Sequence, residues 1–355
     1  MTGLTWTLGI ATYNRADVLR RCLLLAAKQT RPPVEIVVVD GSDDWAETRE
    51  KALAELAEAA PGLRVIYDEA VKRSAAAQRN QCLRAASGDV VFLFDDDSLM
   101  YPDCAERIMA IYDADRTGRI AGVAAVLAND PPDETGGDAE GDGVNRIAAS
   151  GFGQVDAKRS GASRFARNLL GASRTFVPYD PAYVLPQLPE DLGVPNVGLR
   201  DTMAGFTMTV RREVGLAEPF EEILMDRGPE DSDASHRYTR HGALATALDA
   251  RVCHLVSPAG RFGLYSRFHL GMLGAAVAHR LHCVDPAWSR PRFRKMIFRR
   301  LLIAAIKDVR RGNPQMSEAK AAWDAWRLID RVFRMPEEEL RRWYPEYQRG
   351  VLGRK

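Results

Sequence analysis

The stretch Val90-Val91-Phe92-Leu93-Phe94-Asp95-Asp96-Asp97 decides the fold, because five apolar residues run directly into three carboxylates. A continuous apolar run of this length is typical of a strand that is buried on both faces of a parallel sheet. Adjacent Asp side chains resist burial unless they are paired or bind a metal ion, and open α/β sheets bind ligands at the carboxyl ends of their strands. The stretch therefore predicts a site for Mg²⁺ or Mn²⁺, with a solvated acidic turn as the alternative.

The composition of the whole chain limits the classes of protein to consider. The chain has 355 residues, 46% hydrophobic and 27% charged, which is ample for a packed core and for more than one structural unit. The net charge of +1 provides no overall field for a nucleic acid, so we expect no such partner. Five cysteines without a CxxC pair are typical of reduced thiols in a cytosolic protein.

The same sequence predicts a cytoplasmic location. The first residues lack the basic and apolar regions of a signal peptide, and no window reaches about 18 uninterrupted apolar residues. Contact with the inner membrane surface from the cytoplasmic side stays open as an alternative.

Strands and helices alternate through the first 128 residues. The patterns predict strands at 7–11, 35–40, 63–67, 90–94 and 120–127, with helices at 17–29, 47–60, 74–86 and 102–112 between them. Such alternation predicts an α/β fold with a doubly wound, mostly parallel sheet.

The second part of the chain begins with an interruption at residues 129–200. Residues 129–161 are acidic and rich in glycine, which predicts mobility, and residues 162–200 are interrupted by prolines. Beyond this insertion or flexible loop we expect strands at 203–210 and 248–255, and a helix that begins near Pro229 and continues to Arg240. A helical C-terminal region follows from Tyr265.

A basic segment lies at residues 290–311 of that helical region. It holds many Lys and Arg residues, one acidic residue (Asp308), and enough apolar residues to form one helix face. It is predicted to be either a helix for a membrane surface or an anionic acceptor, or a solvated helix whose apolar side packs on the core.

The order of short motifs across residues 5–256 resembles that of the family 2 glycosyltransferases, inverting enzymes with a GT-A fold. The matching pieces are Thr12-Tyr13-Asn14-Arg15, Gln29-Thr30, Glu35 to Ser42, Arg79-Asn80, Gly88 to Asp97 with Pro102-Asp103, Gly205 with Arg211-Arg212, Glu230-Asp231, and His254. The chain departs from the family in having only Asp40 before Gly41-Ser42.

The resemblance implies a division of the chain. A nucleotide-sugar-binding half would span residues 1–128 and an acceptor-binding, catalytic half residues 201–264. The insertion 129–200 and the helical region 265–355 lie largely outside the resemblance. Because the Gln-x-x-Arg-Trp signature of processive synthases is absent, the implied reaction is hexosyltransferase-like transfer of a single sugar.

The resemblance also implies roles for the polar residues, since a departing nucleoside diphosphate builds negative charge that a divalent metal neutralises. Asp97 is the expected direct metal ligand, Asp95 would contact the metal or the ribose, and His254 would ligate the metal or a phosphate. Asp40 would accept from a nucleobase, most simply the uracil of a UDP-sugar. The remaining predicted contacts to the nucleotide are Thr12, Arg15, Arg79 and Asp96. For His254, the alternative is a core histidine with satisfied hydrogen bonds.

The expected general base is Asp231, with Glu230 supporting it or binding the acceptor. A carboxylate in the first turn of a helix stays ionised because the helix dipole favours the anion. The alternative is ordinary acidic charge at a helix start. The acceptor (a glycan, a lipid-linked sugar or a small molecule) and the oligomeric state stay open. So do two other classes, a nucleotidyltransferase and a non-catalytic binder of sugar nucleotides.

Overall fold

The computed structural model describes residues 3–132, 177–225, 229–255 and 263–353. These residues divide into two compact units, which we call the sheet unit and the helical unit. The sheet unit comprises residues 3–132, 185–220 and 234–255. The helical unit comprises residues 177–184, 221–225, 229–233 and 263–353.

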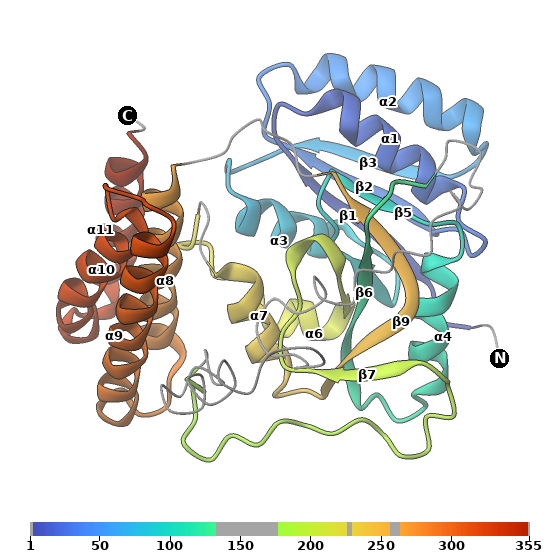
Figure 1. The fold of residues 1–355 in the computed structure, drawn as a ribbon. Coiled ribbons are helices and arrows are strands. Elements are labelled where there is room, and N and C mark those ends of the chain that lie inside the picture. Colours follow the sequence, from blue (N-terminus) through green and yellow to red (C-terminus); the bar gives the residue numbers. More distant parts are fainter. Residues whose placement is uncertain (1–2, 133–176, 226–228, 256–262, 354–355) are drawn as a thin grey trace. The chain divides into compact units, whose positions relative to one another are not determined.

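The described residues of the sheet unit form one sheet of nine strands (Figure 1). Its strands are β1 (Trp6–Thr12), β2 (Glu35–Asp40), β3 (Arg64–Glu69), β4 (Val90–Phe92), β5 (Ser98–Met100), β6 (Ile120–Ala128), β7 (Val197–Arg200), β8 (Met208–Arg211) and β9 (Ala243–His254). Their order is β3-β2-β1-β4-β8-β6-β9-β5, and β7 pairs with β9. Strands β1 to β4 are parallel to one another, as predicted, and β6 is parallel to β9. The strands β5, β7 and β8 run antiparallel to their neighbours.

Helices cover both faces of this sheet (Figure 1). One face packs against α1 (Ala16–Ala27), α2 (Trp45–Ala59) and α4 (Cys104–Ala114), and the other against α3 (Ala75–Ala85) and α6 (Arg212–Ala217). Successive side chains of a strand point to opposite faces. Ile36 of β2 therefore joins the first core and Val37 the second. Every residue of β2 is buried, which explains its uninterrupted apolar run.

Several short elements differ from the sequence prediction. Strand β4 ends at Phe92, and β7 lies in a segment predicted to be irregular. A 3₁₀ turn, η1 (Gly205–Thr207), interrupts the strand predicted at 203–210, and β8 begins only at Met208 and contains four residues. Elements of three or four residues are too short to show a period of their own. Residues 133–161 of the segment predicted to be mobile lie outside the described residues.

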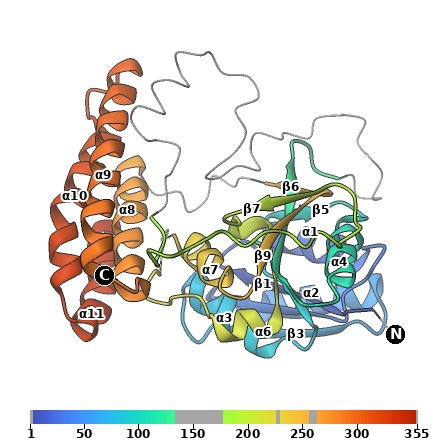
Figure 2. The same cartoon turned by 90° about the horizontal axis from the view of Figure 1, so that it is seen from below.

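The helical unit is built on four long helices, which confirms the helical character predicted from Tyr265 onward (Figure 2). They are α8 (Leu264–His282), α9 (Pro286–Arg310), α10 (Ser317–Arg334) and α11 (Glu337–Leu352). Their shared core includes Leu273, Phe293 and Ile329, and it holds Leu224 from the segment before α7 (Glu230–Tyr238). No helix among the described residues combines the length and the apolar character that a membrane crossing needs.

Candidate functional site

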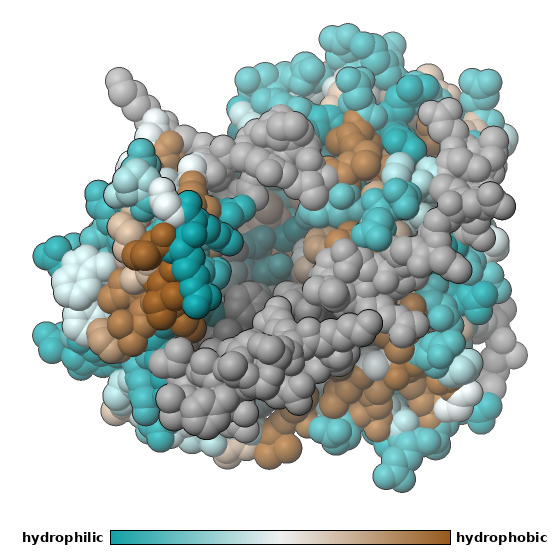
Figure 3. Space-filling model, viewed as in Figure 1, coloured by the Kyte–Doolittle hydropathy of each residue, from teal (hydrophilic) through white to brown (hydrophobic). Residues whose placement is uncertain are grey.

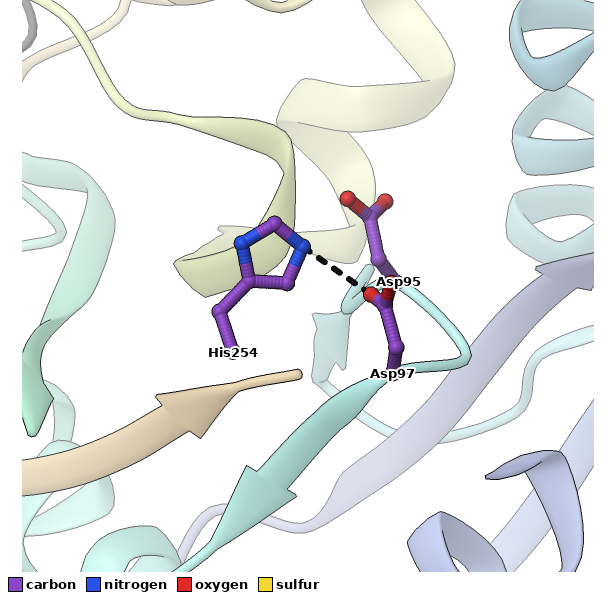
Figure 4. A group of neighbouring side chains, drawn as sticks. All are labelled: Asp95, Asp97 and His254. Atoms are coloured by element: carbon purple, nitrogen blue, oxygen red, sulfur yellow. Dashed lines mark ion pairs between the residues drawn. The ribbon is translucent and has the colours of Figure 1, made fainter. Parts of the chain in front are cut away.

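Three potential metal ligands lie close together at one end of the sheet. The ligand atoms of Asp95, Asp97 and His254 all lie within 4.8 Å of one another, and Figure 4 shows the imidazole facing Asp97. The two aspartates belong to the loop between β4 and β5, whereas His254 ends β9. Antiparallel pairing of β5 with β9 places Ser98 opposite His254, so the register of the sheet brings the histidine to the carboxylates.

Asp97 is the most deeply buried of the three ligands, with 3% of its surface exposed. Its Oδ2 accepts a hydrogen bond from Arg15 Nη1 at 3.0 Å. Its Oδ1 lies 3.0 Å from His254 Nε2, yet receives no well-oriented hydrogen bond from any residue that the structure describes. Burial lowers the pKa of His254, but the adjacent Asp97 carboxylate more than offsets this, so the pKa is raised overall. The ring is also held by Phe206, which stacks on it at 4.6 Å.

This set of side chains fits a divalent cation. A buried carboxylate oxygen without a donor is costly in a protein interior, and a cation would compensate that cost. Two carboxylates supply the hard oxygen ligands that Mg²⁺ and Mn²⁺ prefer. One imidazole beside them favours Mn²⁺, because Mg²⁺ takes nitrogen ligands less readily.

Asp96 points to a different set of partners. Its Oδ2 accepts from Thr12 Oγ1 at 2.7 Å and its Oδ1 accepts from Arg15 Nη1 at 2.9 Å. Burial raises the pKa of Asp96 to about 6, although the hydrogen bond from Thr12 and the charge of Arg15 act in the opposite direction. The predicted nucleotide contacts Thr12, Arg15 and Asp96 therefore form one network that ties the acidic loop to the end of β1.

Arg79 anchors the first aspartate of the triplet from α3. Its Nη2 donates to Asp95 Oδ1 at 2.6 Å, and its guanidinium lies 5.6 Å from the centroid of the Phe220 ring. The arginine is 5% exposed. A Cβ atom at position 205 would lie 2.5 Å from Arg79 Nη2, so the absence of a side chain at Gly205 gives room to this arginine.

Asp40, the predicted nucleobase contact, is bound to protein groups at the end of β2. Its Oδ1 accepts from the backbone N–H of Ser42 at 2.8 Å and from Ser42 Oγ, and its Oδ2 accepts from the Tyr67 hydroxyl at 2.7 Å. Burial and the hydrogen bond to Asp40 raise the pKa of Tyr67. Each carboxylate oxygen can accept two hydrogen bonds, so a nucleobase contact would add to these bonds. That contact stays a prediction.

Part of the chain is similar to known proteins. Residues 7–138 match the model of Glycosyl transferase family 2. A putative glycosyltransferase, EpsH of Bacillus subtilis (strain 168), is 31% identical over 100 residues. That match covers 28% of this chain and 28% of the relative.

Solved structures show the same fold over nearly the whole chain. A structure of GalNAc-T7 with UDP, GalNAc and Mn²⁺ has a TM-score of 0.54 at 15% sequence identity, and covers 97% of this chain and 58% of that one. Residues 1–349 of S. aureus TarS in complex with UDP-GlcNAc give a TM-score of 0.52 at 15% identity, and cover 98% and 88%. The fold is therefore of the GT-A type, as the sequence predicted.

The sequence did not identify three residues that hold the site in place, Gln78, Tyr67 and Phe206. Gln78 Nε2 donates to the backbone oxygens of Thr12 and Val39, at 2.8 and 2.9 Å, and so holds the ends of β1 and β2 together. Tyr67 and Phe206 orient Asp40 and His254. Only Tyr67 had a usable signal, because parallel pairing of β2 with β3 places it two positions from the residue that pairs with Asp40.

Glu230 and Asp231, the predicted catalytic residues, lie outside the family 2 match, in the first turn of α7. The helix begins one residue later than predicted, because Pro229 precedes it and accepts from the N–H of Asp233 at 2.8 Å. Asp231 Oδ1 accepts from the N–H of Ser232 at 2.6 Å. These five residues belong to the helical unit. The catalytic assignment of Glu230 and Asp231 stays a prediction.

Proposed function

We propose that this protein is a metal-dependent glycosyltransferase that moves one sugar from a nucleoside-diphosphate sugar to an acceptor hydroxyl, with inversion. One observation carries the proposal. The Asp95, Asp97 and His254 side chains converge at an end of a GT-A-type sheet, and the buried Asp97 Oδ1 has no well-oriented donor among the described residues. The family 2 match over residues 7–138 supports the class of reaction.

Mn²⁺ or Mg²⁺ would be held by Asp97 and Asp95, with His254 as the third ligand. When bound, the ion would supply positive charge for the leaving diphosphate. The other residues of the site act by position. Arg15 and Thr12 hold Asp96, Arg79 holds Asp95, and Phe206 stacks on the imidazole, so the ligands are preorganised before the donor arrives.

The donor is proposed to be a UDP-sugar, bound through the first 128 residues. The GalNAc-T7 structure contains UDP and Mn²⁺, and the TarS structure contains UDP-GlcNAc, which supports a nucleotide-sugar of this kind. Asp40 would accept from the nucleobase. Arg15 and Arg79 contact aspartates of the acidic loop. Both arginines would balance the negative charge of donor phosphates bound near this loop.

Transfer to the acceptor is proposed to use Asp231 as general base, with Glu230 assisting or binding the acceptor. A single base on the side opposite the leaving group implies one displacement and inversion at the anomeric carbon. The acidic first turn of α7 supports this role, because the amino end of a helix stabilises a carboxylate.

Hydrolysis of the donor tests the proposal without knowledge of the acceptor. We expect slow release of nucleoside diphosphate from one member of a panel of nucleotide sugars when Mn²⁺ is present, and its loss with EDTA. The panel is first screened by thermal stabilisation, which selects the donor. Donor that binds but is never hydrolysed or transferred would favour a non-catalytic binder. Release of inorganic pyrophosphate from a nucleoside triphosphate and a sugar phosphate would identify a nucleotidyltransferase.

A further inference from the structure

Helix α9 has apolar side chains on a face that the described residues of its own unit leave exposed. Phe298, Leu302, Ile306 and Val309 follow one another at spacings of four, four and three residues, which places them on one side of a helix. Their exposed fractions are 44%, 41%, 50% and 70%. The core of the unit instead receives other residues of α9, including Ile297, which is fully buried.

The adjoining helix α10 extends this apolar surface with two tryptophans. Trp323 is 44% exposed and stacks on Trp326 at 5.4 Å between ring centroids, and Trp326 lies 6.3 Å from Phe298. Figure 3 shows an apolar area over the long helices, bordered by hydrophilic side chains. Tryptophan suits a boundary between water and hydrocarbon, because the ring is apolar and its N–H is polar.

The charged residues around this surface are unbalanced in sign. The nearby acidic groups are engaged within the unit, since Asp330 pairs with Arg290 and Arg294, and Glu318 pairs with Arg311. Asp308 is buried and accepts from the backbone N–H of Ala319 at 2.9 Å.

The basic residues on the same side of α9 have no such partners. Lys295, Arg299 and Arg310 form no ion pair with any residue in the described part of the chain. The surface therefore combines exposed apolar groups with an excess of positive charge.

We propose that this surface, made by Phe298, Leu302, Ile306 and Val309 of α9 with Trp323 of α10, docks on an anionic lipid bilayer. The apolar side chains would enter the boundary between headgroups and acyl chains, and Lys295, Arg299 and Arg310 would face the anionic headgroups. A second copy of the chain is a poorer occupant. In a two-fold dimer, the basic residues of one copy would lie close to the same basic residues of the other copy. Like charges that face each other in an interface are unfavourable.

The experiment measures binding of the full chain to vesicles of phosphatidylserine and phosphatidylcholine, with pure phosphatidylcholine vesicles as the reference. We expect binding to the anionic vesicles, and a steep loss of binding as salt rises from about 0.05 M to about 0.5 M. Replacing Arg299 and Arg310 by alanine should weaken binding about fivefold for each charge. The combined change Leu302→Asp and Ile306→Asp should weaken it by at least about tenfold.

The matched control is Val71→Asp in the sheet unit, where the valine is 91% exposed and lies away from the basic segment in sequence. This variant should bind vesicles like the wild type, and all variants should keep the melting temperature of the wild type. Absence of vesicle binding at low salt overturns the proposal, as does equal binding by the wild type and the Leu302/Ile306 variant. Loss of a dimer in those variants, without any vesicle binding, would assign the surface to a second copy.

Discussion

Asp97→Asn separates the metal function of this carboxylate from its structural contacts. Asparagine keeps the shape of the side chain and an oxygen acceptor, but it loses the negative charge. Arg15 keeps Asp96 as a partner at 2.9 Å, and Asp95 and Asp96 experience one like charge fewer. We therefore expect the stability of the metal-free protein to change by no more than about 1 kcal/mol, the size of an ordinary hydrogen bond.

The effect on ligand-dependent stability should be much larger. A ligand that binds only the folded protein stabilises it by about 2.7 kcal/mol when its concentration is about 100 times Kd. Each kcal/mol raises the melting temperature by about 2–4 °C for domains of about 150–250 residues, so UDP with Mn²⁺ should raise it by roughly 5–10 °C. In Asp97→Asn this rise should disappear. Thermal melts with and without UDP, Mn²⁺ and EDTA measure the difference.

A control and a second variant keep this test decisive. Asp191→Asn removes a carboxylate whose side chain is 76% exposed and paired with Arg119, so it should retain the full rise. His254→Gln removes a metal ligand of different chemistry and should lose most of the rise even if Asp97→Asn fails to fold. An unchanged Mn²⁺-dependent rise in a folded Asp97→Asn protein would refute the assignment of Asp97 as a ligand.

Two further predictions concern the helical unit. Asp231→Asn should leave UDP affinity nearly unchanged and lower turnover by roughly 10²–10⁴-fold, the usual contribution of a positioned base; a retained anomeric configuration in the wild-type product, or near-normal turnover in the variant, would contradict the role. Burial raises the pKa of Glu221, but hydrogen bonds and charges from His282 and Arg341 outweigh burial and lower the pKa to about 2. The ionised carboxylate therefore stabilises the fold fully above its ordinary pKa of 4.5. This stabilisation is lost as pH falls toward 2. In Glu221→Gln, the unfolding free energy should therefore fall less between those pH values, by up to roughly 3 kcal/mol. Urea titrations at several pH values measure this difference. If the unfolding free energies of the wild type and the variant change in parallel with pH, the Glu221 carboxylate does not stabilise the fold in this way.

The sequence predicted the acidic site because its signals are local and strong. The run from Val90 to Asp97 joins a buried strand to a polar turn within eight residues. Both the strand and the loop can therefore be predicted from the order of apolar and acidic residues. His254 was expected at a strand end, and pairing of β5 with β9 brings it to Asp97. In contrast, β7 has four residues and lies among prolines, and Phe206 belongs to a 3₁₀ turn whose stacking on His254 depends on tertiary contacts.

Helix α9 shows a different limit of sequence reasoning. Apolar residues occur on both sides of it, since Phe293 and Ile297 are buried whereas Phe298 and Leu302 are exposed. Periodicity alone could not say which set packs on the core, and the two interpretations of segment 290–311 stayed open for that reason. In the structure, one face of α9 packs within the helical unit and the other carries the exposed apolar surface, and membrane contact stays a proposal.

The charges around the acidic loop explain why metal and nucleotide should bind together. Asp95, Asp96 and Asp97 carry three negative charges when ionised, and Arg15 and Arg79 offset two of them. One negative charge remains when His254 is neutral, so a divalent cation would leave the site with an excess of positive charge. A diphosphate neutralises that excess, and each ligand should therefore raise the affinity for the other by the same factor. We therefore expect Mn²⁺ alone to stabilise the protein less than Mn²⁺ together with UDP. The reason is that Arg15 and Arg79, which orient the carboxylates, also weaken the attraction of the carboxylates for a cation.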